Sequence, residues 1–549
     1  MSFACPVRDQ RLVLEHVVRI GELGVDLDTV DAVLEGAAAF AEGQFAPLDR
    51  IGDTIGARWS EGTVTMPTGY KAAYAAFVEG GWMTLAAPLE HGGQGLPLSL
   101  AAAMMEDLQA ANTGFAMLPV LSLGAVEALE AHGGDELKDA YLARIVSGEW
   151  PATMNLTEPQ AGSDVGALKT RAEPDGDGSW RVTGTKIFIT FGEHDLTDQI
   201  IHLVLARTVG APDGTRGISL FLVPKILPDG TANDLRCVSI EHKMGIHASP
   251  TCVMSYGDHG GATGWLIGPE HGGMRAMFTM MNNARLNVGL QGVGIAERAT
   301  QRAVAFALER KQGSRAGAPA AIADHPDVRR MLLRMRALTL GARALTYSGF
   351  AALDRGEADR AAVLTPLAKA WATDVGCEVA SLGIQVHGGM GFIEETGAAQ
   401  HLRDARIAPI YEGTNGIQAA DLVTRKLTLG NGAALDDLIA DIRADAVDAR
   451  LVALTDAVEA LTASLRAAEP DDRLAGSYPY LTMMAVLVAG WLLERVDGAL
   501  AADSDDFSAA RRAAIALFLG SVVPEALGLG AAAGQGAEVL YRAPAEALA

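Results

Sequence analysis

The hydrophobic pattern of the chain changes twice along its length. Residues 1–150 repeat apolar side chains at helical spacing, as in LDTVDAVLEGAAAFAEGQFAPL and SLAAAMMEDLQAANTGFAML. Residues 151–262 instead hold period-two and β-rich runs, such as WRVTGTKIFIT and QIIHLVLART. Helical spacing returns over residues 263–430 and again over residues 431–549. We therefore predict an N-terminal helical domain, a central β-domain, a helix bundle and an extra C-terminal helical extension.

Turns and glycines refine this fold class. Three Pro-Asp-Gly turns, at 174–176, 212–214 and 228–230, punctuate the β region. The long helical patterns after it are typical of a helix bundle. Because strands do not alternate with helices, a Rossmann domain is not expected. The glycines of GLQGVGIAER (289–298) follow no strand, so helix packing explains them better than a dinucleotide-binding loop.

Composition narrows the functional class. The 549-residue chain has a formal charge of −23, which disfavours nucleic-acid binding because that affinity comes from Lys and Arg on phosphates. Cys5, Cys237, Cys252 and Cys377 are too scattered for a disulfide framework or a zinc cluster. The apolar run 481–493 is too short to span a bilayer, and the N-terminus is too charged for a secretory signal. We expect a cytoplasmic protein with no metal and no membrane contact.

Two stretches near the start of the β region carry candidate chemistry. MNLTEPQAGSD (154–164) offers the hydroxyls of Thr157 and Ser163, and Gly162 allows close backbone approach. A capped turn would explain this stretch equally well. TKIFIT (185–190) ends a predicted strand on another hydroxyl, and by itself it is an ordinary strand.

A lone acid stands out in the bundle region. IYEGTNGIQ (410–418) places Glu412 between an aromatic ring and a glycine. From that stretch alone, a solvated loop acid is the more ordinary explanation. GGMGF (388–392) is also an ordinary turn, although its backbone N–H groups could approach a pyrophosphate closely.

Together these motifs resemble the acyl-CoA dehydrogenase family of flavoproteins. They occur in the family's order over about residues 40–430: PLEHGGQGLP, LTEPQAGSD, TGTKIFIT, KMGIHASPTCVMSYG, NNARLNVG, ERKQGSR, QVHGGMGF and LRDARIAPIYEGTNGIQ. The C-terminal extension and the wording of the motifs are most similar to the subgroup that includes 3-methylmercaptopropionyl-CoA dehydrogenases. The resemblance implies a helical domain, a β-barrel or β-sandwich and a four-helix bundle, with FAD held between them.

The resemblance also implies site residues. FAD would be contacted by Met154, Leu156, Thr157, Gly162, Ser163, Phe188, Ile189, Thr190, Arg310, Gln385, Gly389, Thr414 and Asn415. The acyl-CoA substrate would be contacted by Ser163, Asn282, Arg285 and Gly413. Of the first set, Arg310, Gln385 and Gly389 would hold the ADP part of FAD across a subunit interface. Many relatives have Trp where this chain has Phe188.

Glu412 matches the catalytic base of the straight-chain family members. Such a base removes the α-proton of an acyl-CoA thioester, so its pKa must rise towards neutrality. The backbone N–H of Glu412 and a flavin ribityl hydroxyl would stabilise the enolate charge on the thioester oxygen. FAD would accept the β-hydride.

The expected activity is therefore FAD-dependent α,β-dehydrogenation of an acyl-CoA to a trans-2-enoyl-CoA, as in fatty acid metabolism. The expected substrates are 3-methylmercaptopropionyl-CoA or a short- or medium-chain acyl-CoA, and an electron-transfer flavoprotein is the expected acceptor. A homodimer is favoured over a tetramer. The alternatives are an acyl-CoA oxidase that uses O2, a non-catalytic flavin- or nucleic-acid-binding relative, and a purely structural scaffold. The presence of Glu412 argues against lost catalysis.

Overall fold

The computed structural model describes residues 3–549, apart from the side chains of residues 280–282. The chain forms two compact units. Unit 1 comprises the residues up to Gly36, Leu98–Ala110 and Arg285–Ala549, and unit 2 comprises Ala37–Pro97 and Ala111–Ala284. Each unit takes helices from the first 150 residues, so the predicted limits of an N-terminal domain stay a prediction.

The first 150 residues are mainly helical, as predicted, with one short hairpin. The helices and strands are α1 (Val7–Val13), α2 (Leu27–Phe40), α3 (Asp49–Ile55), β1 (Arg58–Ser60), β2 (Thr63–Thr65), α4 (Tyr70–Glu79), α5 (Leu98–His132), α6 (Asp135–Leu137) and α7 (Ala143–Val146). The hairpin was not predicted. Its two turn residues, Glu61 and Gly62, both have positive φ, which is the geometry of a tight two-residue hairpin turn.

The β-domain, in unit 2, is confirmed. Its strands are β3 (Ala152–Asn155), β4 (Arg171–Pro174), β5 (Trp180–Thr190), β6 (Ile201–Thr208), β7 (Ile218–Pro224), β8 (Leu235–Ile240), β9 (Thr251–Tyr256) and β10 (Ala262–Ile267). The pairing order β10-β7-β6-β4-β5 closes on itself because β10 also pairs with β5. Along β6, Leu203 and Leu205 enter one hydrophobic core, whereas Val204 and Ala206 enter another. Both faces of this strand are therefore buried, since successive side chains point to opposite sides.

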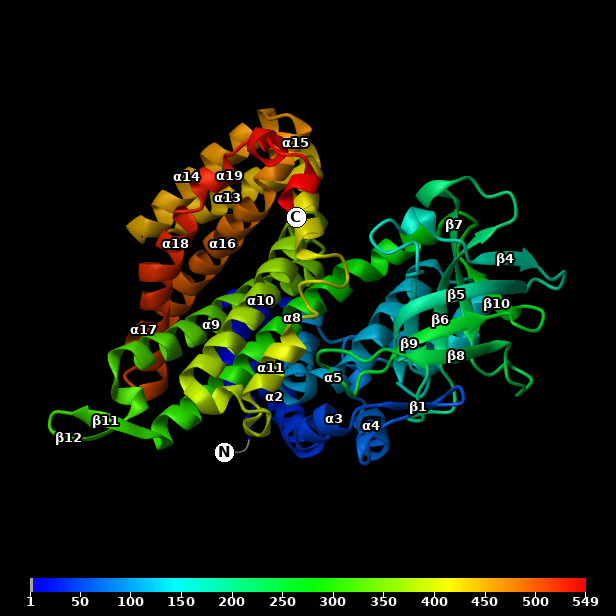
Figure 1. The fold of residues 1–549 in the computed structure, drawn as a ribbon, viewed down its shortest axis with the longest axis horizontal. Helices are drawn as coiled ribbons and strands as arrows, with labels where there is room; N and C mark the ends of the chain where they lie inside the picture. The colour runs from blue at the N-terminus through cyan, green and yellow to red at the C-terminus, as the bar shows by residue number, and fades with distance from the viewer. Residues whose placement is uncertain (1–2) are drawn as a thin grey trace. The chain divides into compact units, whose positions relative to one another are not determined.

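Long helices dominate unit 1 (Figure 1). They are α8 (Gly273–Glu309), whose first turns belong to unit 2, then α9 (Pro326–Asp354), α10 (Ala358–His387), α11 (Ala398–Ala405) and α12 (Asn415–Thr424). α8 runs unbroken through the glycines of 289–298. A Cβ on Gly292 would lie 2.1 Å from the Ala372 carbonyl oxygen, and one on Gly294 would lie 2.8 Å from the Ala110 backbone nitrogen. The helix-packing interpretation of these glycines is thus confirmed.

A β hairpin follows α8. It is formed by β11 (Lys311–Arg315) and β12 (Ala318–Ala321), which pair antiparallel. Ala316 and Gly317, both with positive φ, form its turn.

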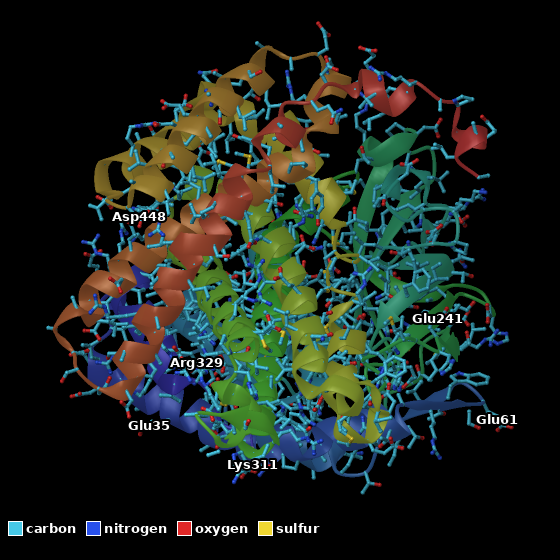
Figure 2. The ribbon with its side chains drawn as sticks, turned by 60° about the vertical axis from the view of Figure 1, so that its left-hand side comes forward. Glu35, Glu61, Glu241, Lys311, Arg329 and Asp448 are labelled. Carbon is cyan, nitrogen blue, oxygen red and sulfur yellow. The ribbon has the colours of Figure 1, made fainter. Side chains whose placement is uncertain are left out.

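The C-terminal extension is helical, as predicted. Its helices are α13 (Ala433–Asp445), α14 (Ala449–Ala467), α15 (Pro470–Ala475), α16 (Ser477–Ala499), α17 (Asp506–Leu517), α18 (Val523–Leu527) and α19 (Gly530–Ala533). Asp448, labelled in Figure 2, caps α14 by accepting a hydrogen bond of 2.8 Å from the Arg450 backbone N–H. The apolar run 481–493 is buried inside α16, which packs against α9, α10 and α12.

Two other helical stretches, Leu98–His132 and Asp506–Ala533, are long and apolar enough to cross a membrane by length and composition. In the first, 78% of the most apolar window is buried within the protein, which is how a core helix also behaves; in the second, 39% is buried. All four cysteines lie in the described part of the chain, and none of them is in a disulfide.

A buried ionic cluster joins the elements of unit 1. Arg343, fully buried, donates to both oxygens of Glu106 and, at 2.9 Å, to Glu297. Arg336 also donates to Glu297, at 2.7 Å. Arg511, from α17, donates two hydrogen bonds to the buried carboxylate of Asp9 in α1. The C-terminal extension is therefore tied to the N-terminal helix by charge-assisted hydrogen bonds.

Candidate active site

Glu412 lies in the turn between α11 and α12, in unit 1. Its φ is 53° and that of the next residue, Gly413, is 83°, so two successive residues are left-handed. A Cβ on Gly413 would lie 2.8 Å from Gln418 Nε2, the end of a flexible side chain, so the positive φ rather than lack of space is what favours glycine here. Thr414 then caps α12 by accepting a 3.1 Å hydrogen bond from the Ile417 N–H. The letters EGTN thus encode a tight turn followed at once by a helix start.

The carboxyl group of Glu412 is poised to hold a proton. Burial raises its pKa, and the positive charges of Arg285 and Lys369 oppose that rise without cancelling it. Among the residues that the structure describes, none donates a hydrogen bond to this carboxylate; Arg285 Nε instead donates to the Glu412 backbone carbonyl, at 3.4 Å. The group therefore has a raised proton affinity and free lone pairs, which suit a general base.

Lys369, a buried residue of α10, stabilises this turn through hydrogen bonds. Its Nζ donates to the Gly413 carbonyl at 2.8 Å and to Asn415 Oδ1 at 2.9 Å. Burial lowers the pKa of Lys369 to about 7, although the charge of Glu412 works in the opposite direction. Sequence reasoning missed this residue. The available signal was one lysine inside the apolar helical run TPLAKAWA.

The side chain of Asn415, which the family resemblance assigned to FAD, is fully engaged inside unit 1. Its Nδ2 donates to the Ala370 carbonyl at 3.0 Å, to Thr373 Oγ1 at 3.0 Å and to Asp374 Oδ1 at 2.9 Å. A contact of this residue with FAD stays a prediction, and only its backbone is left to make one. The adjacent Thr414 is partly buried, with its hydroxyl oxygen used as the helix cap.

Two of the predicted substrate-binding residues lie beside Glu412. Arg285 is buried on α8, and a Cβ placed on Gly413 would be 3.5 Å from its Nη2. Burial lowers the pKa of Arg285, while Asp421 and Glu412 favour its charged form. The Asn282 side chain lies outside the described residues. Ser163 belongs to unit 2.

In unit 2, a buried ion pair fixes the stretch 154–164 against β5. Lys186 Nζ donates to the Leu156 carbonyl at 3.0 Å and to Glu158 Oε1 at 2.8 Å. Burial opposes the charge of Glu158, but Lys186 and Thr170 outweigh it and lower the pKa of Glu158 to about 2. Burial in turn lowers the pKa of Lys186 to about 8. Both residues were missed, because a TEP and a TKI tripeptide reveal no pairing by themselves.

The predicted flavin contacts within 154–164 differ in their exposure. Met154 is buried, Leu156 and Thr157 are partly buried, and the Thr157 carbonyl accepts a 2.9 Å hydrogen bond from the Ile187 N–H. Gly162 and Ser163 are exposed, and nothing lies within 4 Å of a Cβ placed on Gly162. A ligand can therefore approach the backbone of this stretch closely.

Phe188 is presented by an irregularity in β5. The pairing of β5 with β9 shifts register between Lys186 and Ile189, and Phe188 has a φ of 60° with 57% of its surface exposed. Ile189 points inward and is buried, while the Thr190 carbonyl accepts a 2.6 Å hydrogen bond from Thr153 Oγ1. Bulges of this kind re-aim side chains near active sites. An exposed aromatic ring on a rigid strand fits a flat cofactor ring.

The predicted ADP-binding residues of unit 1 are all exposed. Arg310 follows the end of α8, Gln385 lies in the last turn of α10, and Gly389 lies in the short helix Gly388–Phe392. Nothing lies within 4 Å of a Cβ placed on Gly388 or Gly389. An arginine, an amide and an open glycine backbone are groups that fit a pyrophosphate and an adenine.

Family models match the chain in four consecutive segments. They are the acyl-CoA dehydrogenase N-terminal domain (28–149), middle domain (153–258) and C-terminal domain (271–427), and the acetyl-CoA dehydrogenase C-terminal-like domain (430–544). The 3-methylmercaptopropionyl-CoA dehydrogenase of Ruegeria pomeroyi is 46% identical over 546 residues, covering 92% of each chain. The chain belongs to the acyl-CoA dehydrogenase family. The broad-specificity linear acyl-CoA dehydrogenase FadE5 of Mycobacterium tuberculosis is 34% identical and covers 89% of each chain.

Solved structures agree on the fold. A Bacillus anthracis acyl-CoA dehydrogenase complexed with FAD has a TM-score of 0.77 at 20% identity, covering 95% of this chain and 90% of that one. As a member of the acyl-CoA dehydrogenase family, the chain is an oxidoreductase that uses FAD. FAD accepts the hydride in such a reaction, and the protein supplies orientation and the proton acceptor.

Proposed function

We propose that Glu412 is the base of this acyl-CoA dehydrogenase and removes the α-proton of the bound thioester. The observation that carries the proposal is the left-handed turn at Glu412 and Gly413, which holds a carboxyl group of raised pKa with no hydrogen bond from the residues described. A carboxylate with raised proton affinity is a stronger base at neutral pH than an exposed one. The backbone N–H of Glu412 is the donor that we assign to the thioester oxygen.

The binding residues form two sets. For FAD, we assign Met154, Leu156, Thr157, Gly162, Ser163, Phe188, Ile189 and Thr190 in unit 2, and Arg310, Gln385, Gly389, Thr414 and Asn415 in unit 1. For the acyl-CoA, we assign Ser163, Asn282, Arg285 and Gly413. The open glycine backbones and the exposed Phe188 support the FAD set, and the closeness of Arg285 to Gly413 supports the substrate set.

The substrate that we propose first is 3-methylmercaptopropionyl-CoA, with short and medium straight-chain acyl-CoAs next. The 46% identity to an enzyme named for that thioester supports the first, and the relative named for linear acyl-CoAs supports the second. We propose that reduced FAD passes its electrons to an electron-transfer flavoprotein and that the enzyme is a cytoplasmic homodimer. The acceptor, the location and the homodimer are proposed from the family resemblance.

An anaerobic titration tests the base. The purified holoenzyme is mixed with acyl-CoAs from propionyl to palmitoyl, including 3-methylmercaptopropionyl-CoA, while the flavin absorbance is followed. The wild type should bleach with one group of thioesters. Glu412→Gln should keep FAD but reduce it at least about a thousandfold more slowly, because removal of a positioned base costs that order of rate.

The control is Glu35→Gln, a change of the same chemistry at an exposed position on α2 (Figure 2). It should bleach like the wild type. Normal bleaching of the Glu412→Gln variant would refute the base assignment. A wild type that no thioester bleaches would refute the proposed substrates.

A further inference from the structure

A continuous chain of hydrogen bonds connects the C-terminal extension to the turn that carries Glu412. Tyr478, in the first turn of α16, donates from its hydroxyl to Asp374 Oδ2 at 2.7 Å. The other oxygen of Asp374 accepts from Asn415 Nδ2 at 2.9 Å. Asn415 Oδ1 accepts from Lys369 Nζ at 2.9 Å, and the same Nζ donates to the Gly413 carbonyl at 2.8 Å. Every link lies within unit 1.

We propose that Tyr478, Asp374 and Lys369 are positioning residues that set the proton affinity of Glu412, so that the C-terminal extension takes part in tuning the base. The proposal rests on the assignment of Glu412 as the base. It gives the extension a role in the reaction beyond packing. We call the four side chains of Tyr478, Asp374, Asn415 and Lys369 the relay.

The relay has a geometric basis. Asn415 is 3% exposed and Lys369 is fully buried, so neither can exchange its partners for water without moving the turn. α16 packs against both α10 and α12, the helices that carry the other three relay residues. Buried polar networks of this kind rigidify what they hold, because an unmet partner is costly.

Each ionisable group along the relay also shifts the pKa of the next one in a definite direction. The hydrogen bond from Tyr478 favours the ionised form of Asp374, whose pKa burial raises. A charged Asp374 favours the charged form of Lys369, and a charged Lys369 favours the ionised form of Glu412. Loss of the Tyr478 hydroxyl should therefore make Asp374 neutral more readily, weaken the charge of Lys369 and raise the pKa of Glu412.

Other charged and titratable groups surround the same residues. They are Arg285 from α8, Asp421 in α12, Arg425 at its end, Arg406 in the turn after α11, Cys377 in α10 and Tyr411 beside the base. None of them is changed in the test, so their effects on Glu412 stay constant between the wild type and the variants. Because Glu412 and Lys369 interact, the midpoint read from the pH dependence of the rate is an apparent value that belongs to both groups together.

The decisive variant is Tyr478→Phe, which removes one hydroxyl at a position 38% exposed. The measurement is the pH dependence of the rate of flavin reduction in a single anaerobic turnover. The probe is 3-methylmercaptopropionyl-CoA or whichever thioester of the panel bleaches the wild type fastest. The midpoint of the acid limb should move up by about 0.5 pH unit, as expected for the loss of one hydrogen bond in a three-step relay.

The matched control is Tyr480→Phe, two residues away on the same helix. The Tyr480 hydroxyl is paired with Thr462 Oγ1 at 2.6 Å, outside the relay. Its loss should disturb the C-terminal extension at least as much, because Tyr480 is fully buried, yet leave the acid limb where the wild type has it. Equal midpoints for Tyr478→Phe and the wild type, or equal shifts in both Tyr variants, would overturn the relay.

Lys369→Met gives a second reading closer to the base. It should raise the same midpoint by about 1 pH unit, because the favourable charge on Glu412 is removed outright. The Glu412→Gln variant separates two kinds of failure. Loss of reduction in Glu412→Gln with an unmoved acid limb in Tyr478→Phe would remove the relay and leave the base. Retained reduction in Glu412→Gln would remove the base itself.

Discussion

Two glutamates of unit 1 are placed among arginines and lysines, yet their proton affinities move in opposite directions. Arg336 and Arg343 outweigh the burial of Glu297 and lower its pKa. Arg285 and Lys369 do not outweigh burial at Glu412, and its pKa is raised. Both carboxyl groups face two cations, so the number of charges nearby is not what separates them.

The two carboxylates differ in the contacts that their cations make. Glu297 accepts from Arg336 at 2.7 Å, from Arg343 at 2.9 Å and from Gln301 at 3.0 Å. Near Glu412, Arg285 and Lys369 instead donate hydrogen bonds to backbone carbonyls, those of Glu412 and Gly413. At Glu297 the charges of Arg336 and Arg343 lower the pKa most, and hydrogen bonds from Gln301 and Arg343 lower it further, whereas at Glu412 only the charges oppose burial. Glu297, which holds buried arginines in the fold, is fully bonded, whereas the carboxylate of the candidate base Glu412 accepts no hydrogen bond from the part of the chain that the structure describes.

The largest effect on stability is expected at Glu297. Glu297→Gln should lower the free energy of unfolding by about 3 kcal/mol, because two buried arginine charges lose their shared counter-charge. The readout is the urea midpoint of tryptophan fluorescence at neutral pH. The rate of flavin reduction per bound FAD should stay within about threefold of the wild type. A normal urea midpoint would show that the cluster is not what holds α8 and α9.

Arg285→Ala should have an intermediate effect, on binding. We expect the Michaelis constant for the acyl-CoA to rise by about tenfold to a hundredfold, since a charge-assisted contact contributes about 1.5–3 kcal/mol. The FAD content after dialysis should be unchanged. An unchanged Michaelis constant would contradict the substrate role, and loss of FAD would point to a structural role for this arginine.

The smallest effect on stability is expected for Glu412→Gln, within about 1 kcal/mol. The contribution of Glu412 to the free energy of unfolding should change with pH in the opposite direction to that of Glu297. A lowered pKa stabilises the fold above the ordinary value of 4.5, and this stability is lost as the pH falls through the folded value. A raised pKa means that the folded state loses stability as the pH rises above 4.5.

Urea midpoints measured between pH 4.5 and pH 8 can separate these two signs. The urea midpoint of Glu297→Gln should fall further below that of the wild type as the pH rises through this range, until the difference levels off. The urea midpoint of Glu412→Gln should match that of the wild type near pH 4.5 and should equal or exceed it near pH 8. The same trend in both variants would break the contrast between a bonded and an unbonded carboxylate.

The residues that local rules govern were predictable. The β-domain follows from period-two runs and Pro-Asp-Gly turns, and α16 follows from its apolar run. The turn at Glu412 could be located because EGTN combines an acid, a glycine and a helix cap. The hairpin β1–β2 was missed because its three-residue strands are too short to show a period.

Partners far apart in the chain were not predictable from one sequence. Lys369 meets the Gly413 carbonyl 44 residues later, and Tyr478 meets Asp374 across 104 residues. Neither pair has a local signature, because a lysine or tyrosine in an apolar helix usually reads as core or surface. The same is true of Glu158 and Lys186, which are 28 residues apart.

The amino-acid sequence by itself determined the order of helices and strands, the family and the position of the candidate base. These depend on spacing, on turn chemistry and on several motifs in a fixed order, all of which are local. Only the tertiary structure decided that the Glu412 carboxylate receives no hydrogen bond from the described residues while Glu297 accepts three, and that the C-terminal extension reaches the turn of Glu412 through Tyr478. Proton affinity depends on burial and on neighbours brought together by folding, and a linear sequence carries neither.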